Sequence, residues 1–143
     1  EFRRVLFRSL FGKSFSREQD NPINAALNYG YAILLSAVNR EILSLGYITQ
    51  LGLNHCNQFN PYNLGSDLME PLRGFVDAVV IKLRPAEFDR NVKLALIELL
   101  SEDVKINDTV QTFSAAIRIY CKSVFDALCT QNANQIRFIE YEL

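Results

Sequence analysis

The sequence lacks the features by which several protein classes are recognised. Its longest nearly apolar run, Gly30–Val38, is followed at once by polar and charged residues, whereas a bilayer span needs about 20 apolar residues. A transmembrane helix is therefore excluded. Three cysteines in 143 residues do not make a disulfide framework, and their scarcity favours a reducing compartment. The formal net charge of −1 gives no general sign of nucleic-acid binding.

Several catalytic motifs are missing as well. The sequence contains no Walker loop or other glycine cluster that cradles phosphate, no nucleophile elbow, and no Cys–His pair with a credible third partner. It has no internal repeat and no low-complexity stretch. What is present is the composition of a globular protein, with 49% hydrophobic and 22% charged residues. The length suits one domain with a real core.

The first nine residues, EFRRVLFRS, have an unusual possible origin. They can be encoded by GAG TTC AGA CGT GTG CTC TTC CGA TCT, which looks like a common short-read sequencing adapter. We therefore expect residues 1–9 to be an adapter translation artefact and residues 10–143 to be native, with the true start missing. The alternative is a basic amphipathic lead. Without the segment, 15 basic and 16 acidic residues become 12 and 15, a net charge of −3.

Apolar residues recur at helical spacing along most of the chain, which predicts a single all-α domain of several helices. A capping Asp20 or Asn21 before Pro22 marks the start of the longest helix, and Gly46 marks its end. Turn-forming residues make 52–66 irregular, and the stretch near 104–112 predicts a small β-hairpin. We expect helices at residues 23–45, 68–83, 88–100 and 113–128, and an ordered or partner-bound tail at 138–143.

Any chemistry centres on the only histidine. His55 lies in a polar loop, and Asp67 and Glu70 open the next predicted helix. A loop that returns to a helix can bring an imidazole and a carboxylate together. One histidine with one or two carboxylates is a ligand set for Mg²⁺ or Mn²⁺, and the imidazole favours Mn²⁺. Such an ion could activate a hydroxyl and clamp a phosphate.

Structural roles for the same residues remain open at this point. His55 alone fits a hydrogen-bonded structural residue, and Glu70 fits the third position of a capping box begun by Asp67 or an acid near a helix N-terminus. A zinc site needs four nitrogen or sulfur ligands. Cys121 and Cys129 are distant from His55 along the chain, and we expect both in the core.

Longer stretches of the sequence resemble a known family. The resemblance is to the CRISPR-associated integrases of spacer acquisition, and most of all to their type II branch. It is dense from Leu10 to about Asp77 and looser toward the C-terminus. The residues that carry it are Phe11-Gly12-Lys13-Ser14-Phe15-Ser16-Arg17, Asn21-Pro22-Ile23-Asn24-Ala25-Ala26-Leu27-Asn28-Tyr29-Gly30-Tyr31-Ala32, Leu51-Gly52-Leu53-Asn54-His55 and Asp67-Leu68-Met69-Glu70-Pro71-Leu72-Arg73.

The resemblance implies both a fold and a site. Family members have an N-terminal β-rich domain and a C-terminal helical catalytic domain, and residues 10–143 would be most of the latter. A divalent metal, Mg²⁺ or Mn²⁺, is held there by a Glu, a His and a second acid. The last two match His55 and Glu70, which are therefore the expected catalytic and metal-binding residues. The first Glu belongs upstream of Phe11, where Glu1 does not fit the pattern, so the fragment itself is expected to be incomplete and inactive.

Two residues that lie one helical turn from Glu70 are expected to assist the metal site. Asp67, one helical turn before Glu70, is expected either to bind the ion or to orient a ligand. Arg73, one turn after Glu70, is expected to contact DNA phosphate, with a solvated surface arginine as the alternative. A net charge of −3 leaves no general excess of cations for DNA. The basic residues that could still cluster lie in the first two-thirds of the chain: Lys13, Arg17, Arg40, Arg73, Lys82 and Arg84.

The resemblance also implies the activity. The full-length protein would be a metal-dependent DNA integrase and endonuclease that inserts new spacers into a CRISPR array by transesterification, as part of antiviral defence. Its implied partners are double-stranded DNA (prespacer and repeat), a second copy of itself, and a small CRISPR-associated adaptation protein of ferredoxin-like fold. The implied location is the prokaryotic cytoplasm, with no membrane partner. The alternative is a non-catalytic helical interaction module or a degenerate relative.

Overall fold

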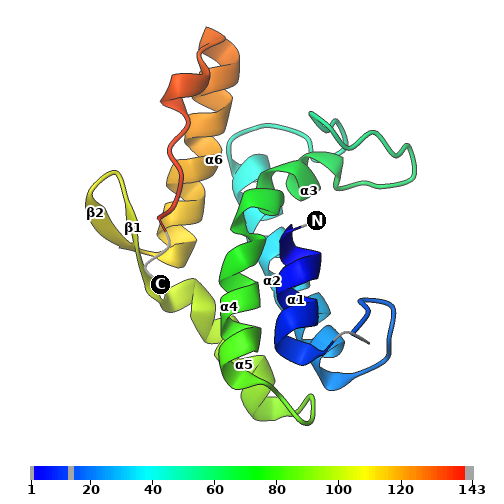
Figure 1. Ribbon diagram of the computed structural model, residues 1–143. Helices are drawn as coiled ribbons and strands as arrows, with labels where there is room; N and C mark the ends of the chain where they lie inside the picture. Colours follow the sequence, from blue (N-terminus) through cyan, green and yellow to red (C-terminus); the bar gives the residue numbers. More distant parts are fainter. Residues whose placement is uncertain (1, 13–14, 141–143) are drawn as a thin grey trace.

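A computed structural model describes residues 2–12 and 15–140, and its elements are mainly helical (Figure 1). One short antiparallel hairpin accompanies the helices, which confirms the predicted all-α class with a hairpin near 104–112. The elements are α1 (Phe2–Phe11), α2 (Pro22–Ser44), α3 (Asn63–Met69), the 3₁₀ turn η1 (Glu70–Leu72), α4 (Arg73–Leu83), α5 (Arg90–Glu98), η2 (Leu99–Ser101), β1 (Asp103–Ile106), β2 (Thr109–Thr112), α6 (Phe113–Thr130) and η3 (Ala133–Gln135).

Helix α2 is the central element and packs against α3, α4, α5 and α6. It begins where the sequence predicts, because the Asn21 side chain accepts a hydrogen bond from the backbone N–H of Asn24 and Pro22 fills the first turn. It ends at Ser44, and Gly46 follows with a positive φ of 84°. Gly30 lets α4 and α5 approach: a Cβ there would lie 2.4 Å from Cγ1 of Val76 and 3.1 Å from Cδ2 of Leu96.

The helix predicted over 68–83 is divided and starts earlier. Residues 63–66, expected to be irregular, form the first turn of α3, and α3 passes through η1 into α4. Pro71 explains the interruption, because proline has no N–H and its ring crowds the carbonyl four residues back, that of Asp67. The chain tightens into a 3₁₀ turn at this point. The early start was missed because the local residues, Asn63, Gly65 and Ser66, are weak helix formers.

The hairpin and α6 form a second group, on the left in Figure 1. Asn107 and Asp108 have φ of 52° and 59°, which allows the tight turn that pairs Asp103 with Thr112. Thr112 then caps α6 by accepting the N–H of Ala115. After α6 the chain folds back, and a bridge joins Lys105 to Glu140. Residues 138–140 of the predicted tail are therefore placed, whereas 141–143 lie outside the described residues.

Helix α1 covers one side of α2 and α4 in Figure 1. Phe7 is buried, and its ring stacks on those of Phe11 and Phe15. This packing does not test the adapter origin of residues 1–9, which stays a prediction; Glu1 lies outside the described residues. Among the residues that are described, no helix is both long and apolar enough to span a bilayer.

Candidate metal centre

His55 lies on the long connection between α2 and α3, here called the α2–α3 loop (residues 46–62). The loop projects beside α3 at the upper right of Figure 1. It returns to the start of α3, where the backbone N–H of Leu64 donates to the carbonyl of Thr49 at 2.9 Å. The Thr49 hydroxyl donates to the carbonyl of Pro61 at 2.8 Å. These bonds close the loop at its base, so that its interior lies against the side chains of α3.

Asp67 on α3 organises the interior of the loop. Its carboxylate accepts the backbone N–H groups of Leu53 at 2.5 Å, Asn54 at 2.9 Å and His55 at 3.1 Å. Only 8% of the Asp67 side chain is exposed. Burial by itself would raise the pKa of Asp67, but the hydrogen bonds from Asn54, His55 and Leu53 outweigh it and hold that pKa below its ordinary value. Asp67 is therefore ionised at neutral pH.

The His55 ring is oriented by the same carboxylate. Its Nδ1 lies 2.5 Å from Oδ1 of Asp67. An ionised carboxylate can only accept, so the hydrogen in this bond belongs to Nδ1. In the neutral ring Nε2 then carries the lone pair. Histidines that bind metals through one ring nitrogen commonly donate the N–H of the other to a carboxylate, which fixes their tautomer and orientation. His55 is 40% exposed, and its Nε2 makes no hydrogen bond with the described residues. The ring is therefore partly exposed and has one nitrogen that points away from Asp67.

Glu70 lies one turn beyond Asp67, and its side chain is 52% exposed. Its Oε2 lies 3.2 Å from Nη2 of Arg73, in an ion pair three residues apart. No hydrogen bond or ion pair joins Glu70 to His55 within the described ranges. Nor does that part of the chain contain three or more His, Cys, Asp or Glu side chains grouped to hold a metal. The structure thus contains two pairs, His55 with Asp67 and Glu70 with Arg73, and the two acidic residues lie one helical turn apart.

The structure rules out one of the structural alternatives. A capping box would place Asp67 at the N-cap of a helix, but α3 begins at Asn63 after Tyr62, and Asp67 lies inside it. The Asp67 carboxylate binds the loop and not the first turn of its own helix.

The cysteines follow the predictions only in part: all three are free and Cys121 is buried, but Cys129 is exposed. The Cys129 thiol lies 3.8 Å from the Tyr47 hydroxyl, and burial was wrongly predicted for it because an α-helical pattern does not show which neighbours cover its last turn.

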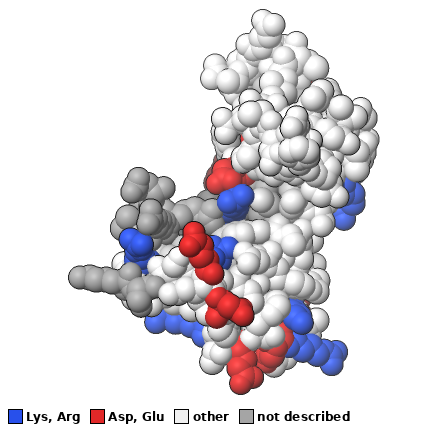
Figure 2. All heavy atoms as spheres, turned by 90° about the vertical axis from the view of Figure 1, so that its right-hand side faces the viewer, with Lys and Arg blue, Asp and Glu red and all other residues white. Residues whose placement is uncertain are grey.

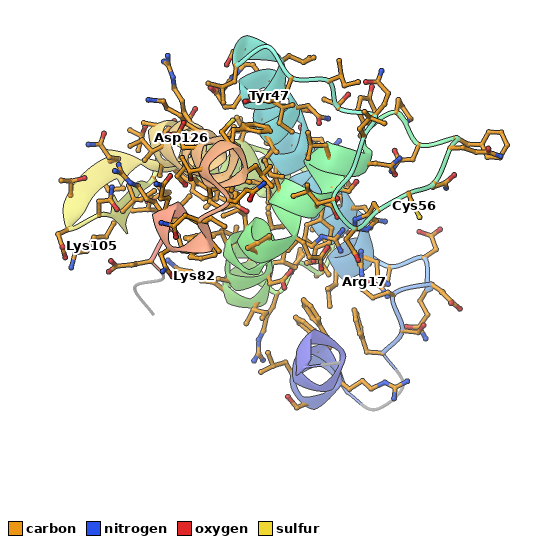
Figure 3. All side chains as sticks on the ribbon, turned by 90° about the horizontal axis from the view of Figure 1, so that it is seen from above. Arg17, Tyr47, Cys56, Lys82, Lys105 and Asp126 are labelled. Carbon is orange, nitrogen blue, oxygen red and sulfur yellow. The ribbon has the colours of Figure 1, made fainter. Side chains whose placement is uncertain are left out.

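Two arginines beside Tyr31, one of them the ion-pair partner of Glu70, were not assigned a joint role from the sequence. The guanidinium carbons of Arg17 and Arg73 lie 5.7 and 5.4 Å from the ring centroid of Tyr31. Arg17 also donates to the side-chain oxygens of Asn24 at 2.5 Å and Asn28 at 2.6 Å. Only the spread of basic residues in the first two-thirds of the sequence pointed to this cluster. Figure 3 places Arg17 on the same side of the molecule as Cys56, the residue after His55, and opposite Lys105.

Charge is distributed unevenly around the site. Residues 42–66 contain no Lys, Arg, Asp or Glu, and the upper part of the face in Figure 2 is accordingly free of charged side chains. Asp67 is the first charged residue after Glu41. Its negative charge meets backbone N–H groups and an imidazole but no basic side chain of the loop. An added cation beside His55 would therefore face no local like charge from the loop.

With this geometry in place, comparison with known proteins identifies the class. A family model described as "CRISPR associated protein Cas1" matches residues 8–91, a range that includes α2, His55, Asp67, Glu70 and Arg73. The protein is therefore a CRISPR-associated protein. The chain belongs to the Cas1 family, which confirms the resemblance found in the sequence; its assignment to the type II branch stays a prediction.

Individual relatives agree with this assignment. The chain is 37% identical over 141 residues to a "CRISPR-associated endonuclease Cas1" of Neisseria meningitidis serogroup C (strain 8013), covering 95% of the chain and 46% of the relative. It is 34% identical over 120 residues to a second such endonuclease, of Pyrobaculum aerophilum, covering 80% of the chain and 40% of the relative. A solved "Casposase bound to integration product" superposes with a TM-score of 0.71 at 25% identity, covering 91% of the chain and 45% of that protein. The chain thus spans about half the length of these relatives.

Proposed function

We propose that this helical region serves a metal-dependent DNA integrase and endonuclease that inserts spacers into a CRISPR array. Membership of the Cas1 family supports the proposal, as do the relatives named as endonucleases. The solved casposase, a protein bound to its integration product, adds a DNA-joining relative of the same fold. Because the chain spans about half of these proteins, the activity, the DNA substrates and the partners of the whole protein are all part of the proposal.

The single observation that carries the metal site is the orientation of His55. The Asp67 carboxylate holds Nδ1–H and leaves Nε2 pointing away from it on a side chain that is 40% exposed, while the half-exposed Glu70 carboxylate follows one turn later. A nitrogen and a carboxylate oxygen suit Mn²⁺ or Mg²⁺. We propose that His55 and Glu70 hold the ion together with a further acidic residue that the family resemblance places ahead of Phe11. When bound, the ion would supply Lewis-acid stabilisation of a phosphate and activation of a hydroxyl.

The residues of the chain have distinct tasks in this proposal. Asp67 keeps the imidazole in one tautomer and one orientation. Arg73 holds the Glu70 carboxylate through their ion pair, and together with Arg17 it provides two positive charges beside Tyr31 that favour a nearby DNA phosphate. In the proposed reaction the 3′-hydroxyl of a DNA fragment attacks a phosphodiester at the leader–repeat boundary. A new phosphodiester bond forms, the old one breaks, and the proton of the hydroxyl ends on the 3′-oxygen that leaves.

A strand-transfer assay with the full-length protein tests this function. We expect a labelled duplex with a free 3′-hydroxyl to be joined to a leader–repeat duplex in the presence of Mn²⁺ or Mg²⁺. Chelation of the metal should abolish joining. A fragment that ends in a 3′-deoxynucleotide has no 3′-hydroxyl and should not be joined. If neither metal yields joined product while the protein is folded, the non-catalytic interaction module becomes the better account. The small ferredoxin-like partner is added in a separate reaction, and the dependence of the joining rate on protein concentration shows whether a second copy is required.

A further inference from the structure

The segment that carries His55 is closed by one buried side chain. Asn63, the first residue of α3, is 5% exposed. Its Nδ2 donates to the carbonyl of Gln50 at 3.0 Å and to the carbonyl of Asn57 at 2.8 Å. These carbonyls lie on either side of His55 in the sequence. The two hydrogens of one amide group therefore tie together the ends of the segment 50–57, here called the His55 arc.

The His55 arc fits tightly over α3 and has no room for a larger residue at its centre. A Cβ on Gly52 would lie 2.2 Å from the carbonyl oxygen of His55, 2.8 Å from Oδ2 of Asp67 and 2.9 Å from Cβ of Asn63. Real Cβ atoms essentially never make contacts under 3.0 Å. The arc is thus fixed in two ways: Asp67 binds its interior N–H groups, and Asn63 binds the carbonyls at its ends.

The chemistry of these contacts requires an amide at position 63. Both partners are carbonyl oxygens, which only accept, so the residue between them must supply two donors. Asparagine does so without charge, whereas aspartate, of nearly the same size, would turn both contacts into repulsions. The Oδ1 atom of Asn63 is buried and has no hydrogen-bond partner in the described part of the chain. An unpaired buried acceptor lowers the stability of the folded protein, so the favourable contribution of Asn63 comes from its two donated hydrogen bonds.

We propose that Asn63 is a positioning residue of the candidate metal centre. By closing the His55 arc it keeps Nδ1 of His55 on Asp67, and so keeps Nε2 pointing away from Asp67. The use of Nε2 by a metal rests on the proposed function; the effect of Asn63 on the imidazole does not. Among the described residues, the side-chain hydrogen bonds of Asn63 go to backbone carbonyls and not to the imidazole. Asn63 acts through the backbone of the arc.

The test uses Asn63→Asp and, as a matched control, Asn60→Asp. Asn60 belongs to the same loop, but its side-chain oxygen only accepts, from the N–H of Tyr62 at 3.0 Å, and aspartate can accept in the same way. His55 is the only histidine, so a long-range proton–nitrogen correlation spectrum of the chain, recorded at one fixed pH, shows a single imidazole. We expect the wild type and Asn60→Asp to have one Nδ1–H tautomer, and Asn63→Asp to give averaged or broadened ring signals in an otherwise folded protein.

Addition of Mn²⁺ separates this inference from the proposed function. Loss of the fixed tautomer in Asn63→Asp supports the positioning role whether or not Mn²⁺ affects His55. If Mn²⁺ does not affect His55 in the wild type, that result counts against the metal site and not against the role of Asn63. If His55 does bind Mn²⁺, Asn63→Asp should weaken binding about 10- to 100-fold, as changes behind a ligand do. An unchanged tautomer in a folded Asn63→Asp protein overturns the inference. Should that variant not fold, Asn63→Ser, which retains one donor, takes its place with the same two outcomes.

Discussion

Replacing His55 by alanine, or Glu70 by glutamine, is expected to reduce DNA strand transfer by the full-length protein more than about 100-fold. Changes to residues that only orient a ligand already cost about 10- to 100-fold, and these two substitutions each remove a proposed ligand itself. Since the metal would supply the main stabilisation of charge on the phosphate, its loss cannot be offset by DNA contacts elsewhere. His55 is 40% and Glu70 52% exposed, so both variants should fold.

The measurement is the initial rate of joined product at saturating Mn²⁺, with Glu87→Gln as the control for Glu70→Gln. Glu87 is exposed and lies outside the candidate centre, so its variant should join DNA at the wild-type rate. Thermal unfolding of each variant shows whether the fold is retained. Wild-type rates in folded His55→Ala and Glu70→Gln proteins would remove both residues from the proposed mechanism.

Replacing Asp67 by asparagine or alanine is expected to have the second largest effect, on stability and on the site together. The carboxylate accepts three backbone N–H groups and the imidazole N–H. Hydrogen bonds to a charged group contribute about 1.5–3 kcal/mol each, and buried donors left without an acceptor add to the loss. These bonds are coupled and partly replaceable by water, so we expect a loss of about 2–4 kcal/mol in the free energy of unfolding.

Urea denaturation of the metal-free protein at neutral pH measures this loss, with Asp89→Asn as the matched control. Asp89 caps α5 by accepting the N–H of Val92 at 3.0 Å, and asparagine caps a helix about as well as aspartate. Its variant should therefore differ little from the wild type. The pKa of Asp67 is lowered in the folded state, so its contribution is present at neutral pH and is lost as the pH falls through that lowered pKa. Equal stability of Asp67→Asn and wild type would contradict the account.

Local signals in the sequence were sufficient to predict most of the helices and the hairpin. Asn21-Pro22 and Gly46 bound the central helix close to its observed ends, because capping and positive φ depend on the residues themselves. The hairpin near 104–112 was predicted for the same reason, since Asn107 and Asp108 tolerate the left-handed conformation that its turn requires. Helical spacing of apolar residues predicted α6 as well.

Long-range contacts account for what the sequence did not reveal. The start of α3 depends on Asn63, whose amide binds carbonyls of residues 50 and 57 and thereby ties the first turn to the loop. The His55–Asp67 contact joins residues twelve apart, across the end of the α2–α3 loop and the first turn of α3, so spacing could suggest it but could not fix which nitrogen is used. The approach of Arg17 and Arg73 to one tyrosine ring joins three elements. None of these contacts has a local pattern from which it could be deduced.

The most direct test of the central claim is the electron spin-echo modulation spectrum of Mn²⁺ bound to the 143-residue chain, with protein in excess. Because His55 is the only histidine, imidazole-nitrogen modulation can arise from no other residue. We expect the modulation of one imidazole nitrogen in the wild type, its loss in His55→Ala, and weaker Mn²⁺ binding in Glu70→Gln. Bound Mn²⁺ without imidazole modulation, or modulation that persists in His55→Ala, would contradict a metal centre built on His55 and Glu70.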